Sequence, residues 1–405
     1  MILSVQAPLL AQIGYPGQYP GTGRSGIPLP FPIPRGGGRG SPRPQAGDAV
    51  TSETGKLVKI DSRTIQIETS DRRTVDFRRT SQTKFYREGR EIKESALKLG
   101  DSVSVEGTRD QNGIQYAQSV SLQPAKATAE GSATPPTRTR DADDPGPPVL
   151  KRGAPSRGES ADRPASEPGA AADPFIEKAR VTAASFEQQA PSFVCQEFMT
   201  RYVSNGRPAS WNALDVVSAE VVFENGHESY RNVSVNGKAA RKDIEQLDGS
   251  WSTGEFASVL LDLLSHSTAA EFRFDKLSAS AGAPARVYSF QVAQSNSHWH
   301  VKTVSQSLDP AYQGSVWVEP ESGRVLRIEI QARSLPREFP LDSVEMAVDY
   351  DNVRIGNGQF VLPTHAESLS CQRGSSNCNR NAIDFRNYHK YEVDSSIVYE
   401  GPSRP

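Results

Sequence analysis

Residues 312–367 read YQGSVWVEPESGRVLRIEIQARSLPREFPLDSVEMAVDYDNVRIGNGQFVLPTHAE, and this stretch decides the fold. Its apolar residues recur at every second position, as in Val316–Val318 and Leu326–Ile330, with polar residues between them. A period of two places the apolar side chains on one face of a β-strand. The stretch therefore predicts four consecutive antiparallel strands, each apolar on one face only, and a sheet that needs a cover for that face.

Two tracts of the 405-residue chain lack the apolar residues that a folded core needs. Residues 13–53 are rich in Gly and Pro, and residues 124–172 mix Pro, Ala, Ser, Arg and Asp without periodicity. Both compositions predict disorder. We therefore expect two folded domains, a small one over residues 54–123 and a large one over residues 173–400.

The charge pattern argues against nucleic-acid binding. The net charge is −2, and acidic and basic residues are interspersed along both predicted domains. Neither domain has the basic face that a phosphate backbone requires. Residues 21–26 match the dinucleotide-binding pattern GxGxxG, but no predicted strand precedes them and no helix follows, so we interpret them as linker.

The first residues, 1–12, are apolar and end in Leu-Leu-Ala-Gln, yet they lack a basic n-region. We interpret them as the remnant of a signal peptide whose start codon is assigned too late, with cleavage near Ala11; an N-terminus without a signal stays open as the alternative. No other stretch approaches the ~20 apolar residues of a membrane span. The prediction is an exported protein of the periplasm or cell envelope that does not span the membrane.

Cysteine positions agree with an oxidising compartment. Cys371 and Cys378 lie seven apart between two strand-like segments, so a disulfide at the tip of a hairpin is expected. A zinc-binding thiol pair is the alternative, and it lacks a second Cys or His pair. We predict that Cys195 is a small buried side chain rather than a nucleophile.

The small domain consists of short expected strands separated by turns, and this pattern predicts a small β-barrel. The expected strands are residues 57–60, 64–68, 74–77, 103–107 and 116–122, with one helical turn over residues 94–99. With its Gly55-Lys-Leu-Val start, its Gly100-Asp101-x-Val103 step and Gly107, the segment resembles a small OB-like bacterial domain. Such barrels often bind oligonucleotides through aromatic side chains, but a structural or protein-binding role is favoured here.

Two helices are expected to cover the large sheet. Asp173-Pro174 begins an amphipathic helix that continues to residue 189 and ends before Pro191. Residues 256–265 form a second, mostly apolar helix, with Ser252 or Thr253 as the expected cap. The fold class is mainly β (α+β), a small OB-like barrel plus a large curved antiparallel sheet, or half-barrel, covered by two helices.

Several short motifs carry a family resemblance of the large domain. They are Pro191-Ser-Phe-Val-Cys195, Gly226-His-Glu-Ser-Tyr230, Ser252-Thr-Gly-Glu255-Phe256, Tyr312-Gln-Gly314-Ser-Val-Trp317, Arg324-Val-Leu-Arg327-Ile328, Asp349-Tyr350 and Leu362-Pro363. On these, residues 172–399 resemble an uncharacterised bacterial branch of the LolA-like superfamily, which includes periplasmic lipoprotein carriers. The resemblance implies an incomplete barrel whose helices lid a hydrophobic cavity.

The candidate ligand site is the apolar face itself. In the carrier resemblance its residues line a cavity, and in the alternative they pack against the helices. The candidate lining residues are Val316, Val318, Leu326, Ile328, Ile330, Val344, Met346, Val348, Tyr350, Phe186 and Leu260.

No catalytic constellation or complete metal site is evident in the sequence. His298 and His300 lie on one side of an expected strand over residues 298–305, but a third ligand is missing nearby. We predict no enzyme activity, no cofactor and no metal. The expected function is an exported binding protein that holds a lipid, a lipopeptide or a hydrophobic segment of an envelope protein. The alternative is a structural or protein-interaction module of the envelope without a cavity.

Overall fold

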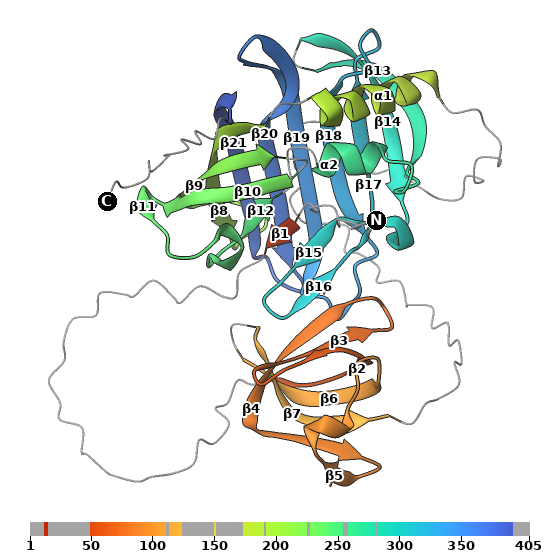
Figure 1. The fold of residues 1–405 in the computed structure, drawn as a ribbon, viewed down its shortest axis with the longest axis vertical. Coiled ribbons are helices and arrows are strands. Elements are labelled where there is room, and N and C mark those ends of the chain that lie inside the picture. Colours follow the sequence, from red (N-terminus) through yellow and green to blue (C-terminus); the bar gives the residue numbers. More distant parts are fainter. Residues whose placement is uncertain are drawn as a thin grey trace, which may run out of the picture.

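The computed structural model describes residues 12–14, 49–110, 113–123, 150, 173–189, 192–224, 227–253, 258–280 and 282–391. Most of the predicted disordered tracts and the GxGxxG match at residues 21–26 lie outside this set. Within it the protein is mainly β, as predicted, with a small barrel, a large sheet and two α-helices (Figure 1).

The small domain is a closed five-stranded barrel. Its strands are β2 (Ala49–Ile60), β3 (Thr64–Thr69), β4 (Thr74–Arg87), β6 (Ser102–Arg109) and β7 (Gln115–Leu122), with a short β5 (Arg90–Ile92) and a 3-10 turn η1 (Glu94–Ala96). Pairing runs β2-β3-β4-β7-β6 and back to β2, and the parallel pair β4–β7 closes the circle. This is the OB-like barrel expected from the sequence.

At two glycines of the OB-like motif, the backbone of a neighbouring strand comes too close for a side chain. A Cβ on Gly55 would lie 2.3 Å from the carbonyl oxygen of Glu68, and one on Gly107 would lie 2.0 Å from that of Tyr116. Any side chain at these positions would therefore push neighbouring strands of the barrel apart.

The large sheet runs in the order β11-β10-β9-β8-β21-β20-β19-β18-β17-β14-β13. These strands are β8 (Phe193–Ser204), β9 (Asn212–Glu224), β10 (His227–Val235), β11 (Lys238–Ala239), β13 (Glu271–Ser280), β14 (Ala283–Val292), β17 (Ala311–Val318), β18 (Val325–Arg333), β19 (Leu341–Ile355), β20 (Gly358–Gln372) and β21 (Cys378–Lys390). Every pairing among them is antiparallel, and β17 to β20 are the four consecutive strands predicted for residues 312–367.

The sheet curls around α1 (Pro174–Gln189) and α2 (Ser258–Leu264), which lie on one side of it (Figure 1). We call this side the helix face and the opposite side the outer face. Apolar residues of both helices join those of the large sheet, from β10 at one side to β14 at the other, in one buried core, as the one-sided alternation predicted. Neither described helix is long and apolar enough to cross a membrane.

The disulfide was also predicted correctly. Cys371 and Cys378 are bonded, and they pair directly across β20 and β21 at the base of the turn over residues 373–377.

Two local predictions were wrong because tertiary pairing redirects the chain. Residues 298–305 were expected to form one strand, but only β15 (His300–Lys302) is extended, and the chain reverses at Thr303 into β16 (Gln306–Leu308). Ser252 and Thr253, expected to cap the second helix, instead belong to β12 (Trp251–Thr253), which pairs with β1 (Gln12–Gly14).

Gly314 in β17 offers a test of the sheet packing. A Cβ there would lie 1.8 Å from the carbonyl oxygen of Glu329 and 2.7 Å from the Phe290 ring. We expect Gly314→Ala to destabilise the protein by about 1–3 kcal/mol, because β18 or the ring must move. Urea denaturation measures the loss. The matched control, Gly206→Ala, meets only one atom at 3.5 Å and should change little, and an equal effect of both variants would contradict this packing.

Candidate functional site

The predicted lining residues lie in the packed core of the helix face. Nine of them share one buried cluster with residues of α1 and α2, and none of the nine exposes more than 4 % of its surface. These nine are Val316, Val318, Ile328, Ile330, Val344, Met346, Val348, Tyr350 and Leu260. An empty cavity wide enough for water would expose the side chains that line it. In this conformation they therefore pack against their neighbours, and a lining role stays a prediction that requires the helices to move.

Two of the predicted lining residues stand apart from this core. Leu326 lies on the outer face with Val287 and Trp317, because a register shift pairs Val318 with Val325 and turns Leu326 to the other side. The prediction that Leu326 shares a face with Ile328 was therefore wrong. Phe186 belongs to α1, but its side chain is outside the described structure.

Polar contacts fix α1 over the helix face. Thr182 donates to the carbonyl oxygen of Ser322 at 3.0 Å, in the turn between β17 and β18. At the start of α1, Asp173 accepts hydrogen bonds from the backbone N–H of Phe175 and from the Tyr288 hydroxyl, each at 2.9 Å. The Arg286 guanidinium lies 4.3 Å from the centre of the Phe175 ring. Opening the half-barrel would have to break these contacts.

A slot for one extended strand lies between β12 and β15. The slot holds β1, which pairs antiparallel with β12 and parallel with β15, so that residue 13 faces both Ser252 and Val301 (Figure 1). Two strand spacings separate β12 and β15, about 10 Å. Ser252 and Val301 are fully buried around the inserted strand. The large domain thus binds a segment from outside its own fold through backbone hydrogen bonds.

The same sheet continues from the slot into the barrel. Its order is β12-β1-β15-β16-β4, and the step from β16 to β4 pairs Gln306 with Val75 and Ser307 with Thr74. Two further hydrogen bonds of 2.8 Å hold the junction, from the N–H of Asp76 to the Ser305 carbonyl and from the Ser305 hydroxyl to the Gly113 carbonyl. Backbone pairing therefore joins the two domains into one sheet.

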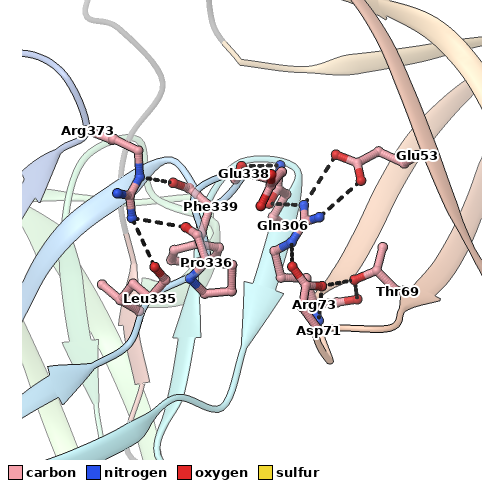
Figure 2. Close-up of polar contacts among 10 residues, drawn as sticks. All are labelled: Glu53, Thr69, Asp71, Arg73, Gln306, Leu335, Pro336, Glu338, Phe339 and Arg373. Atoms are coloured by element: carbon pink, nitrogen blue, oxygen red, sulfur yellow. Dashed lines mark hydrogen bonds and ion pairs between the residues drawn. The ribbon is translucent and has the colours of Figure 1, made fainter. Parts of the chain in front are cut away.

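Arg73 is the central side chain of this junction. Only 3 % of its surface is exposed. Its guanidinium contacts Asp71 at 2.8 Å, Glu53 at 3.1 Å and the Gln306 side-chain oxygen at 3.0 Å (Figure 2). Two carboxylates and an amide thus satisfy a buried cation.

Gln306 extends the network into the large domain. Its side-chain nitrogen donates to the Glu338 carbonyl at 3.4 Å. Arg373, after β20, holds the same loop by donating to the carbonyl oxygens of Phe339 at 2.9 Å and Pro336 at 3.0 Å (Figure 2). The barrel is thereby linked to a loop that the large sheet itself anchors.

The barrel buries two of the aromatic side chains that such a fold could use to bind an oligonucleotide. Phe77 and Phe85 are buried in the barrel core, and the Arg79 guanidinium lies 5.0 Å from the centre of the Phe85 ring. Base stacking requires exposed rings, so these two side chains are not available for it.

Each histidine of the His298–His300 pair is engaged by a carboxylate. The Nδ1 atom of His298 lies 2.6 Å from Asp262, and that of His300 lies 2.7 Å from Asp309. Among the described residues, no cluster of three or more His, Cys, Asp or Glu side chains could hold a metal ion. These contacts hold both imidazole rings in fixed orientations.

Cys195 is fully buried on the helix face, as predicted. Burial first, and then the nearby Glu197 carboxylate, raises the pKa of its thiol far above the usual range. A thiol that stays protonated is a poor nucleophile.

The outer face carries a buried charged group. Arg327 contacts Glu329 at 2.7 Å and Asp349 at 2.6 Å, while Gln331 donates to Glu345 at 2.9 Å. Burial raises the pKa of Glu329 to about 7, outweighing the opposite effect of Arg327. Glu329 is therefore partly protonated at neutral pH.

No family model matches this chain, and no curated protein matches it. By structure, it is similar to a LolA superfamily protein from Nitrosomonas europaea, at 10 % identity and a TM-score of 0.29, covering 54 % of this chain and 93 % of that one. A DUF1329 family protein from Desulfovibrio piger matches at 10 % identity and a TM-score of 0.29, covering 56 % of this chain and 96 % of that one. The MucA/MucB complex of Pseudomonas aeruginosa matches at 13 % identity and a TM-score of 0.18, covering 52 % of this chain and 92 % of that one.

Sequence reasoning missed Arg73 and the strand slot. The partner of Arg73, Gln306, is 233 positions away, and nothing near either residue signals the contact. The slot depends on a pairing between residues 12–14 and strands that are themselves far apart in sequence.

Arg73→Met tests the junction. The change leaves the Glu53 carboxylate without its cation in a mostly buried position, and we expect a loss of about 3 kcal/mol of barrel stability. Urea denaturation with hydrogen-exchange readout of the barrel amides measures it. The exposed neighbour Arg72→Met is the control and should stay within about 0.5 kcal/mol of the wild type. A similar effect of both changes would contradict the proposed role of Arg73.

Glu329→Gln tests the charged group on the outer face. Because the folded-state pKa of about 7 lies above the ordinary 4.5, ionising Glu329 costs the folded protein stability as pH rises from about 4.5 through 7. Gln removes that cost, so the variant should gain up to about 3 kcal/mol over the wild type at pH 8, and the gain should shrink toward pH 4.5. Denaturation at both pH values checks this, and a pH-independent difference would refute it.

Proposed function

We propose that this chain is an exported, non-enzymatic binding protein of the cell envelope, and that its ligand is an extended polypeptide segment. The observation that carries the proposal is the strand slot, in which the large domain pairs β1 on both sides. Strand addition of this kind gives affinity through the backbone and tolerates many sequences. The packed helix face favours such a ligand, because nine of the candidate lining side chains in the described structure are buried against their neighbours.

Two features support the envelope location. The Cys371–Cys378 bond is typical of an oxidising compartment. The predicted cleavage near Ala11 lies immediately before Gln12, the first residue of β1. Processing there would leave the paired segment at the mature N-terminus, where a partner strand can compete with it.

A lipid or lipopeptide inside the half-barrel is the second candidate. The apolar composition of the helix face favours it, since separating α1 from the sheet would uncover an apolar surface. That separation has to break the contacts of Asp173, Thr182 and Arg286 described above.

A peptide competition experiment tests the proposed function. Ile13→Pro in the full-length chain removes an N–H group from β1 and should free the slot. A labelled peptide with the sequence of residues 11–17 should then bind the variant, measured by fluorescence anisotropy, at least tenfold more tightly than it binds the wild type. The same peptide with Pro in place of Ile13 should not bind.

Gln18→Pro, outside the paired segment, is the matched control and should behave as the wild type. Failure of the Ile13→Pro variant to bind the peptide would contradict the strand slot. Uptake of a fluorescent fatty acid by the wild type, abolished when paired cysteines at Thr182 and Ser322 lock α1 to the sheet, would favour the second candidate.

A further inference from the structure

Leu150 packs on the outer face of the large sheet, against residues that are far from it in the sequence. Its side chain is 4 % exposed and packs with Ala347, Leu369 and the Cys371–Cys378 pair, with Trp211 beside them. Its backbone N–H donates to Glu345 at 3.1 Å. Val149 and Leu150 are the only large aliphatic residues between positions 124 and 172, so the seated residue is one of two in that tract that could fill an apolar site.

The seat belongs to the face opposite the helices. Along β19, Val344, Met346 and Val348 enter the helix-face core, while the alternate residue Ala347 joins the Leu150 cluster. Leu150 therefore cannot be part of the core that α1 and α2 cover.

The outer face is buried over an area much wider than one leucine can cover. Glu345 exposes 1 % and Glu329 2 % of their surface, and Arg327 is also buried. Charged residues on a solvent-facing sheet would be largely exposed. Both described helices lie on the other face, so they do not supply this cover.

A second apolar patch continues the buried area across the sheet. Ala285, Val287, Trp317 and Leu326 form a cluster over β14, β17 and β18, and all four are buried. The two patches and the charged group between them form a continuous band from β21 to β14. We call this band the outer-face band.

The chain that follows Leu150 has to reach the start of α1 on the helix face, beside β14. It next enters the described structure at Asp173, whose carboxylate is held by Tyr288 of β14. Strands β18 and β17 lie between β19 and β14, which makes the path roughly 15 Å, whereas 22 residues can span up to roughly 70 Å. This length is enough to cross the outer-face band and then turn around the β13 edge of the sheet to the helix face.

The charges of the segment and the band are complementary. Residues 150–172 contain Lys151, Arg152, Arg157 and Arg163 against three acidic residues, Glu159, Asp162 and Glu167. The band and its edge carry Glu345, Asp349, Glu367 and the partly protonated Glu329 against Arg327 and Arg380. The first two basic residues directly follow Leu150, whose own N–H already contacts Glu345.

We propose that the outer-face band is a docking surface for the chain's own residues 150–172, seated by Leu150. Docking covers the apolar patches and the charged group. The occupant is thus a cis segment, and the surface is closed to partners as long as Leu150 stays seated.

Limited trypsin digestion of the full-length protein tests the proposal, because the tract contains its own internal control. Arg138 and Arg140 precede Leu150, and Arg152 and Arg157 follow it. We expect cleavage after Arg152 and Arg157 to be at least tenfold slower than after Arg138 and Arg140, measured by mass spectrometry of the fragments. Leu150→Asp should abolish the difference, and the matched change Thr137→Asp should leave it intact.

A second readout follows the disulfide beneath Leu150. Cys371 and Cys378 are buried against it, so Leu150→Asp should speed their reduction by dithiothreitol severalfold, while Thr137→Asp should not. Equal cleavage at all four arginines of the wild type, or protection that survives Leu150→Asp, overturns the proposal. Protection that rises with protein concentration also overturns it, because the occupant is then the segment of a second copy.

Discussion

Backbone pairing between β16 and β4 is the interaction on which the arrangement of the protein depends. It merges a closed barrel with strands of the large domain into one sheet, and the buried Arg73 network seals the junction. The slot that holds β1 is two strands away in the same sheet. A barrel attached by a flexible tether alone would leave the position of that slot independent of the barrel, whereas here both belong to one hydrogen-bonded sheet.

The large sheet has two faces, and each is covered in a different way. On the helix face, α1 and α2 complete a core in which the predicted lining residues touch other side chains. This packing shifts the proposed ligand from a lipid in the half-barrel to a polypeptide paired at the slot. On the outer face Leu150 packs against β19, β20 and β21, and the strand slot holds β1, so two sites outside this core hold other parts of the chain itself.

Local patterns in the sequence were sufficient for the elements that depend on local physics. The period-two alternation of residues 312–367 gave four strands in the right order, Asp173-Pro174 marked the start of α1, and the spacing of Cys371 and Cys378 gave the disulfide. Features set by distant contacts were not predictable. The face of Leu326 depends on a bulge, the reversal at Thr303 depends on pairing with the barrel, and a buried arginine such as Arg73 is indistinguishable in sequence from an exposed one.

Native mass spectrometry of the full-length protein, purified from its own cell envelope, tests the central claim most directly. The account predicts the mass of the processed polypeptide with its disulfide intact, either bare or with a peptide adduct that an excess of the residue 11–17 peptide displaces. A lipid-sized adduct that survives purification and that the peptide does not displace would contradict it.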